Sequence, residues 1–307
     1  MGVKFEKIDN FNIPYNALVS LKTMGYQHEI CYVKHRNTKM PIKWLPNGKY
    51  LVLSTFDIKE KNQINNRSES KHQVSQSLKR TRDYINTNVT DISKCKWITL
   101  TYKENMTDTV RLYNDNDKFI KRFRYEYGKL GYKVEYISIC EPQCRGAWHT
   151  HFIFIFDKKV PYIPNKDIEK MWGYGFTKTK KLINIDNIGL YFTAHLGDLS
   201  LEEVEENNIN YFKKDVKEVL KINGKEFKNP KYFVKGARLH LYPPKFNIIR
   251  TSRGIKKPNK ESLKYYEAKE KIGSFRPIYS KTLQLTDTDN DFTNIIKYEH
   301  YNTRRNK

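Results

Sequence analysis

Two histidines and a glutamate are the first residues in the sequence whose types and spacing could do chemistry. His149 and His151 lie two residues apart in an apolar run, 148–156, that predicts a β-strand. Because successive side chains of a strand point to opposite faces, both imidazoles should lie on one face. Glu141 ends the preceding predicted strand, where a hairpin would bring its carboxylate beside them. Two nitrogens and one oxygen leave coordination positions open, which is typical of a catalytic metal site.

Tyr191 is the candidate nucleophile. It lies in a predicted helix at 186–196, which follows the strands that carry the histidines. A phenolate can attack a phosphodiester and later leave it, so a tyrosine suits an enzyme that stores a phosphodiester bond covalently. Since the ordinary tyrosine pKa is near 10, a base must assist, and His195 lies one helical turn further on. The two predicted catalytic residues are therefore Tyr191 and His195.

The elements around these residues alternate between short strands and helices and predict an α+β fold. We expect a central antiparallel sheet of about five strands flanked by helices, with basic extensions at both ends. The predicted strands and helices of the centre are 97–102, 115–128, 136–140, 148–156, 165–172 and 176–185. A hairpin at 42–53 and a helix at 70–85 precede them, and the C-terminal remainder has a less regular pattern.

The charge points to a polyanionic partner. The chain has 307 residues, with 57 Lys and Arg against 34 Asp and Glu, a formal net charge of +23. No apolar run has the length of a spanning helix and no secretory signal is present, so we expect a cytoplasmic protein without membrane insertion. The four cysteines are too few for a disulfide framework.

The cysteines offer a rival interpretation of the histidine pair. Cys140 and Cys144 lie close enough to His149 and His151 to suggest a structural zinc site in a DNA-binding protein that is not an enzyme. The alternation of side chains along a strand argues against this zinc site. Residues 140 and 141 should face opposite sides of the sheet, so Cys140 and Glu141 cannot easily both be ligands.

In several motifs the sequence resembles the rolling-circle replication initiators (Rep proteins) of the HUH endonuclease superfamily. Such proteins are found in Gram-positive plasmids, integrative elements and filamentous phages. Residues 97–102 (WITLTY) resemble the first motif, and residues 141–151 (EPQCRGAWHTH) resemble the second, metal-binding motif. Residues 172–175 (WGYG) and 186–191 (DNIGLY) resemble the approach to the third motif, which carries the tyrosine that cuts DNA. The fold that this resemblance implies is a relative of the split βαβ arrangement.

The resemblance implies metal-dependent, strand-specific nicking and joining of DNA at an origin. A divalent ion, Mg²⁺ or Mn²⁺, held by Glu141, His149 and His151 would polarise the scissile phosphate, and Tyr191 would form a 5′-phosphotyrosyl link. His195 stands where relatives often carry a second tyrosine, which favours a single nucleophile. A relaxase or a single-tyrosine transposase shares this chemistry and remains the alternative enzyme.

The partners implied are single-stranded or hairpin origin DNA and a helicase supplied by the host, because the sequence contains no phosphate-binding loop of an NTPase. Residues 207–260 contain 15 Lys or Arg and 3 acids. The predicted DNA contacts in this segment are Arg250, Arg253, Lys256, Lys257 and Lys260. The predicted division is a basic extension at 1–92, a catalytic domain at 93–245 and a basic region at 246–307, with the oligomeric state open.

Overall fold

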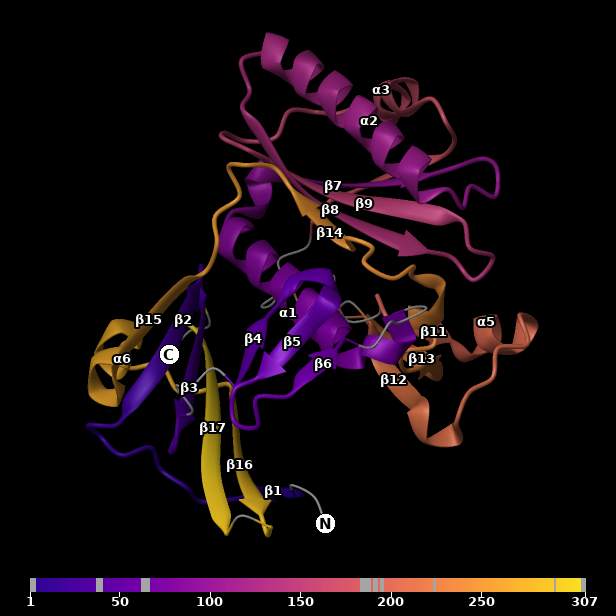
Figure 1. Ribbon diagram of the computed structural model, residues 1–307. Coiled ribbons are helices and arrows are strands. Elements are labelled where there is room, and N and C mark those ends of the chain that lie inside the picture. The colour runs from indigo at the N-terminus through magenta and orange to yellow at the C-terminus, as the bar shows by residue number, and fades with distance from the viewer. Residues whose placement is uncertain are drawn as a thin grey trace. The chain divides into compact units, whose positions relative to one another are not determined.

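The computed structural model describes residues 4–36, 41–61, 67–182, 189, 193, 196–222, 225–289 and 291–304 (Figure 1). The protein is α+β, as predicted, with several antiparallel sheets. Within the described ranges, no helix combines the length and the apolar character needed to cross a membrane.

The chain forms two compact units whose boundaries differ from those expected at 92 and 245. We call residues 1–23, 27–65 and 259–307 the terminal unit, and residues 24–26 and 66–258 the central unit. The two ends of the chain share a unit because β15 (Asn259–Lys264) pairs with β2 (Leu18–Met24). The predicted helix near 70–85 belongs to the central unit.

The terminal unit contains a six-stranded antiparallel sheet in the order β1-β16-β17-β3-β2-β15. Its remaining strands are β1 (Lys4–Ile8), β3 (Gln27–Val33), β16 (Tyr279–Asp287) and β17 (Phe292–Asn302). Helix α6 (Tyr265–Ile272) packs Ala268 and Ile272 into the core of this sheet. The C-terminal segment is thus largely strand, where the sequence had indicated a less regular structure.

The hairpin expected at 42–53 is confirmed. Strands β4 (Ile42–Trp44) and β5 (Lys49–Val52) pair across a turn, and β6 (Ile58–Glu60) adds a third strand. Asn47 and Gly48 both adopt positive φ in this turn, a backbone conformation that asparagine and glycine tolerate best, and this lets the chain reverse direction between the two strands.

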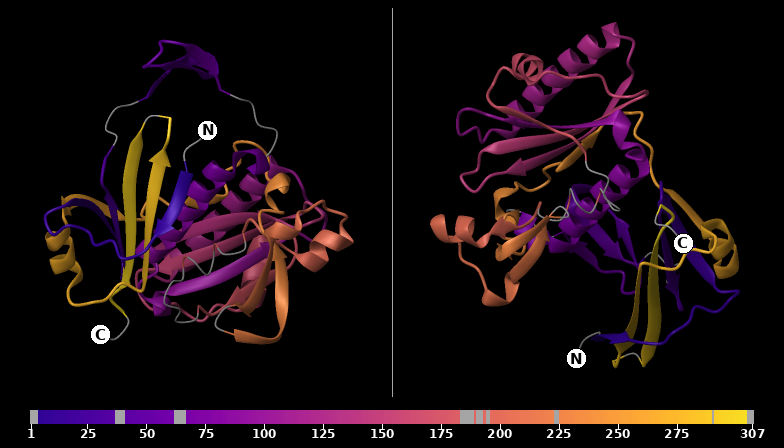
Figure 2. Two further views of the ribbon diagram at one scale, coloured as in Figure 1. Left: turned by 90° about the horizontal axis from the view of Figure 1, so that it is seen from below. Right: turned by 180° about the vertical axis from the view of Figure 1, so that it is seen from behind.

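The central unit is built on a five-stranded antiparallel sheet in the order β10-β7-β9-β8-β14. Its strands are β7 (Cys95–Thr101), β8 (Val134–Pro142), β9 (Trp148–Phe156), β10 (Thr177–Lys180) and β14 (Ile249–Thr251). Helices α2 (Thr109–Lys129) and α3 (Asn165–Trp172) lie on one side of this sheet, and α1 (Lys71–Asn88) lies on the other (Figures 1 and 2). Helix α2 begins six residues before its predicted start, because the Asp108 side chain accepts from two backbone N–H groups and caps the helix.

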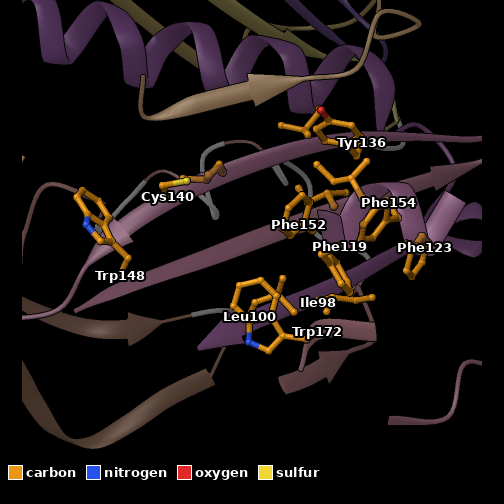
Figure 3. Packing of buried hydrophobic residues seen from close by; sticks show 14 of the residues in the cluster. Ile98, Leu100, Phe119, Phe123, Tyr136, Cys140, Trp148, Phe152, Phe154 and Trp172 are labelled. Carbon is orange, nitrogen blue, oxygen red and sulfur yellow. The ribbon is translucent and has the colours of Figure 1, made fainter. Parts of the chain in front are cut away.

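The α2 side of this sheet is an aromatic core. Phe119 and Phe123 of α2 pack on Phe152 and Phe154 of β9, with the rings of Phe123 and Phe154 stacked at 3.9 Å (Figure 3). Because these residues occupy even positions of β9, the odd positions face the other side. The core therefore determines the face on which His149 and His151 lie.

A second, three-stranded sheet of the central unit has the order β11-β13-β12. It consists of β11 (Leu199–Ser200), β12 (Val216–Ile222) and β13 (Lys225–Val234). Helix α5 (Leu201–Glu206) begins with a capping box between Ser200 and Glu203.

The turn after α3 fastens that helix to β7. The Trp172 indole is fully buried and donates a hydrogen bond to the Thr101 carbonyl, 3.0 Å away. Three residues after Trp172, a Cβ on Gly175 would lie 2.4 Å from both the Thr101 carbonyl oxygen and the Lys103 nitrogen. Only glycine allows the two backbones to come this close.

We expect Gly175→Ala to destabilise the protein by about 2 kcal/mol or more, because backbone atoms must shift to admit the methyl group. Gly128→Ala is the matched control. A Cβ there meets nothing within 4 Å, and alanine in the last turn of α2 should leave the stability unchanged or raise it by up to about 0.5 kcal/mol. Urea unfolding gives the free energy of unfolding of both variants. Equal values would contradict the close approach of the Gly175 backbone to the backbone of Thr101 and Lys103.

Candidate metal and nucleic-acid site

Strand register brings the three predicted ligands to one face of the central sheet. Glu141 of β8 lies directly opposite His149 of β9, and His151 lies opposite Thr99 of β7. The loop between β8 and β9 is short, and Gly146 adopts a φ of 85° in it. The hairpin inferred from the sequence therefore does place the carboxylate beside the two imidazoles.

His151 is held by hydrogen bonds on both ring nitrogens. In its neutral form Nε2 donates to Glu141 Oε2 at 2.9 Å, and Nδ1 accepts from the Thr99 hydroxyl at 3.1 Å. The His149 ring lies 6.3 Å from that of His151, centroid to centroid, at 86°. In contrast to His151, the His149 Nε2 atom is buried without a hydrogen-bond partner among the described residues.

Both imidazoles are poor bases in this environment. Burial lowers the pKa of His149 to about 4, with the neighbouring His151 and Arg145 contributing in the same direction. Burial also lowers the pKa of His151 to about 4, assisted by the positive charge of Lys180. Both rings are therefore neutral at pH 7, which is the form that binds metals.

The chemistry of this donor set fits a divalent cation. It offers two neutral imidazoles, one of them with an unpartnered buried nitrogen, and a carboxylate on the same face. As the side chains stand, however, no three His, Cys, Asp or Glu residues in the described part of the chain are arranged around a common point. Glu141 instead contacts His151 and Arg238. Binding an ion here requires Glu141 to give up at least one of those contacts.

Arg238 is a residue of this site that the sequence did not single out. Its side chain is only 12% exposed and forms an ion pair with Glu141 through Nη1. Nη1 also donates to the Pro142 carbonyl at 3.4 Å, and Nε donates to the Asp198 carbonyl at 3.1 Å. Arg238 is nearly a hundred residues from Glu141 in the chain, so only the tertiary fold reveals the pair.

Two lysines at the edge of the sheet were also missed. Lys178 and Lys180 of β10 pair with Thr99 and Trp97 of β7, which places them on the histidine face. Lys180 Nζ lies 4.7 Å from the centre of the Trp97 ring, and partial burial of the ammonium group, followed by the charge of Lys178, lowers the pKa of Lys180. Both lysines are exposed. The alternation Thr-Lys-Thr-Lys in an extended segment was the signal that could have identified them.

The predicted catalytic residues Tyr191 and His195 lie outside the described residues. Gly189 and Thr193, on either side of Tyr191, are helical. The Gly189 N–H donates to Asn86 Oδ1 of α1 at 2.8 Å, and the Thr193 hydroxyl donates to the Gly189 carbonyl at 2.9 Å. A Cβ on Gly189 would lie 2.4 Å from the backbone oxygen of Arg82. The backbone at Gly189 is thus in direct contact with α1.

The cysteines do not join the histidines. Cys140 faces α2, where its thiol lies 3.8 Å from the Thr150 hydroxyl, and burial raises its pKa to about 11. Cys144 packs beside Val204, and burial with the charge of Glu203 raises its pKa to about 11. The zinc site considered from the sequence is not assembled here, because alternation puts Cys140 on the opposite face of β8 from Glu141.

The predicted DNA contacts differ in their surroundings. Arg250 of β14 forms an ion pair with Asp117 at 3.2 Å and lies over the Tyr113 ring. The other four side chains are exposed, three in the central unit and one in the terminal unit: Arg253, Lys256, Lys257 and Lys260.

Comparison with known protein families places part of the chain in a family model. The family model of the Replication-associated protein ORF2/G2P matches residues 95–200. This range begins with β7, contains the Glu141, His149 and His151 cluster, and includes Tyr191. No curated protein and no solved structure matches the chain significantly. The family match supports a role as a replication initiator.

Proposed function

We propose that this protein is an initiator of rolling-circle DNA replication for a plasmid or other mobile element in the cytoplasm. It nicks and rejoins one DNA strand at an origin as an HUH-type, metal-dependent endonuclease. The observation that carries the proposal is the register of β8 and β9, which places Glu141, His149 and His151 on one sheet face inside the segment matched by the replication-associated family.

Glu141, His149 and His151 would hold a divalent ion, Mg²⁺ or Mn²⁺. Such an ion, when bound, supplies Lewis-acid polarisation of the scissile phosphate. The two imidazoles are suited to this role since they are already neutral at pH 7 and give up no proton on binding. Thr99 keeps the His151 ring oriented through Nδ1.

Tyr191 is the nucleophile of the proposed reaction. Its phenolic oxygen attacks the phosphorus of the scissile phosphodiester, and the phenolic proton passes to a base such as His195. The P–O3′ bond breaks, and the leaving 3′ oxygen takes up a proton from the protonated base or from water. The products are a 5′-phosphotyrosyl link and a free 3′-hydroxyl that primes synthesis. Because one phosphodiester replaces another, attack by a 3′-hydroxyl on the same phosphorus reverses the step and rejoins strands.

Lys178 and Lys180 extend the positive charge of the histidine face along the sheet edge. Exposed lysines beside neutral imidazoles and an ion site would neutralise backbone phosphates of a single strand lying there. The substrate we propose is single-stranded or hairpin origin DNA, and strand separation would come from a host helicase.

The test is a search for a covalent adduct. The protein is incubated with Mn²⁺ and single-stranded oligonucleotides tiled across the replicon that carries its gene, and products are separated in SDS. We expect one oligonucleotide to form an SDS-resistant adduct whose nucleotide-bearing peptide contains Tyr191. Adduct at a transfer origin or at element ends, with none at a replication origin, would instead identify a relaxase or transposase.

The exposed basic residues give a second expected result. Replacing Arg253, Lys256, Lys257 and Lys260 with glutamine should weaken binding to every single-stranded sequence and lower the slope of log K against log salt by about 3. The matched control removes four exposed lysines on and after α2: Lys118, Lys121, Lys129 and Lys133. Fluorescence anisotropy across a salt series measures the affinity of both variants for DNA. Weakening that is confined to one DNA sequence would contradict contacts with the phosphate backbone.

A further inference from the structure

Arg238 connects the candidate metal site to the chain that follows the proposed nucleophile. On one side its guanidinium contacts Glu141 and the Pro142 carbonyl at the end of β8. On the other side its Nε donates to the Asp198 carbonyl and its backbone N–H donates to the Gly197 carbonyl, each at 3.1 Å. A buried cation with this many partners has a defined position.

The ion pair places Arg238 in direct competition with a metal. Glu141 has two carboxylate oxygens: Oε2 accepts from His151, and Oε1 contacts Arg238. A divalent cation that takes Glu141 as a ligand must displace one of these contacts. It must also approach a guanidinium charge in a site where solvent screening is weak, since both side chains are less than a fifth exposed.

The arginine cannot readily withdraw its charge when the cation arrives. The guanidinium hydrogen bonds to the Asp198 and Pro142 carbonyls do not involve Glu141, so they keep the guanidinium near the site after the ion pair is broken. The backbone N–H bond to the Gly197 carbonyl holds the main chain of Arg238 in place. Repulsion between the two cations therefore persists in the metal-bound state, and it lowers the affinity for the ion.

We propose that Arg238 is a positioning residue that sets the affinity of the Glu141, His149 and His151 site for a divalent cation, by competing with the cation for Glu141. This inference rests on the proposed function, because it needs those three residues to be the ligands. It assigns to Arg238 a role that none of the motif residues has: its positive charge keeps the affinity of the site for a free divalent cation low.

The test measures Mn²⁺ binding directly, without DNA and without turnover, by the electron paramagnetic resonance signal of free Mn²⁺. We expect Arg238→Gln to bind Mn²⁺ about tenfold or more tightly than the wild type, because glutamine retains hydrogen-bonding ability without the charge. Arg238→Lys retains the charge and should stay within about threefold of the wild type. Arg124→Gln, which removes the arginine paired with Glu135, should leave the affinity unchanged.

Each other result has a distinct meaning. Equal or weaker Mn²⁺ binding by folded Arg238→Gln overturns the role of Arg238 while leaving the metal site intact. If Arg238→Gln does not fold, a tenfold gain in Arg238→Lys overturns charge as the cause. Failure of the wild type and all variants to bind Mn²⁺ overturns the ligand set itself, and with it the metal-dependent part of the proposed function. Thermal melting followed by circular dichroism establishes which variants are folded.

Discussion

Replacing Tyr191 with phenylalanine is expected to abolish the covalent protein–DNA adduct while binding of the DNA survives. The substitution removes only the phenolic oxygen, which is the atom that bonds to phosphorus in the proposed reaction. Loss of a nucleophile commonly costs about 10⁴-fold or more in rate, so no adduct should be visible on a gel. The ring is retained, so the affinity for the origin strand, measured by anisotropy, should stay within about threefold.

Tyr162→Phe is the matched control for this experiment. Tyr162 belongs to the same unit and is 88% exposed, so its hydroxyl is accessible but lies outside the matched motifs. Its adduct yield should equal that of the wild type. If Tyr191→Phe still forms the adduct at the wild-type rate, Tyr191 is not the nucleophile, and peptide mapping of the adduct would then show which residue is.

Removing a single proposed metal ligand should be nearly as damaging. We expect His149→Ala and Glu141→Gln each to lower the Mn²⁺-dependent rate of adduct formation by about 10³-fold, since the ion contributes several kcal/mol to stabilising the transition state. The wild type should lose adduct formation in EDTA and regain it on adding Mn²⁺, whereas the two variants should not regain it.

His149 is the more informative of the two positions. Its Nε2 has no hydrogen-bond partner among the described residues, so truncating the ring breaks no hydrogen bond of that atom. A large loss of activity with a small loss of thermal stability would therefore point to ligation. Cys140→Ser is the control on the opposite face of the sheet and should leave the response to Mn²⁺ unchanged. Full activity of the wild type in EDTA would contradict a metal-dependent mechanism.

The local parts of the site could be inferred from sequence because they depend on neighbours in the chain. Alternation in 148–156 is sufficient to place His149 and His151 on one face, and the aromatic residues at even positions make the other face the core. A short connection between adjacent strands enforces the pairing of Glu141 with His149. The same reasoning separates Cys140 from Glu141.

The C-terminal strands β16 and β17 could not be predicted from the sequence, for a different reason. In β16 and β17 the burial pattern does not alternate regularly: their residues are largely half-buried, so periodicity carries little signal. Their partners β1 and β3 lie more than 250 residues away. Pairing over such a distance is decided by the assembled sheet, and the boundaries expected at 92 and 245 could not anticipate it.

By itself, the sequence determined the α+β class, the strand faces and the residues able to do chemistry, because backbone alternation and residue type act locally. Only the tertiary structure decided what surrounds that chemistry. It places Lys178 and Lys180 at the edge of the histidine face. It also brings the Gly189 N–H into a hydrogen bond with Asn86 and the Arg238 guanidinium into an ion pair with Glu141. These contacts join segments that are far apart in the chain, and packing, which no local pattern encodes, brings them together.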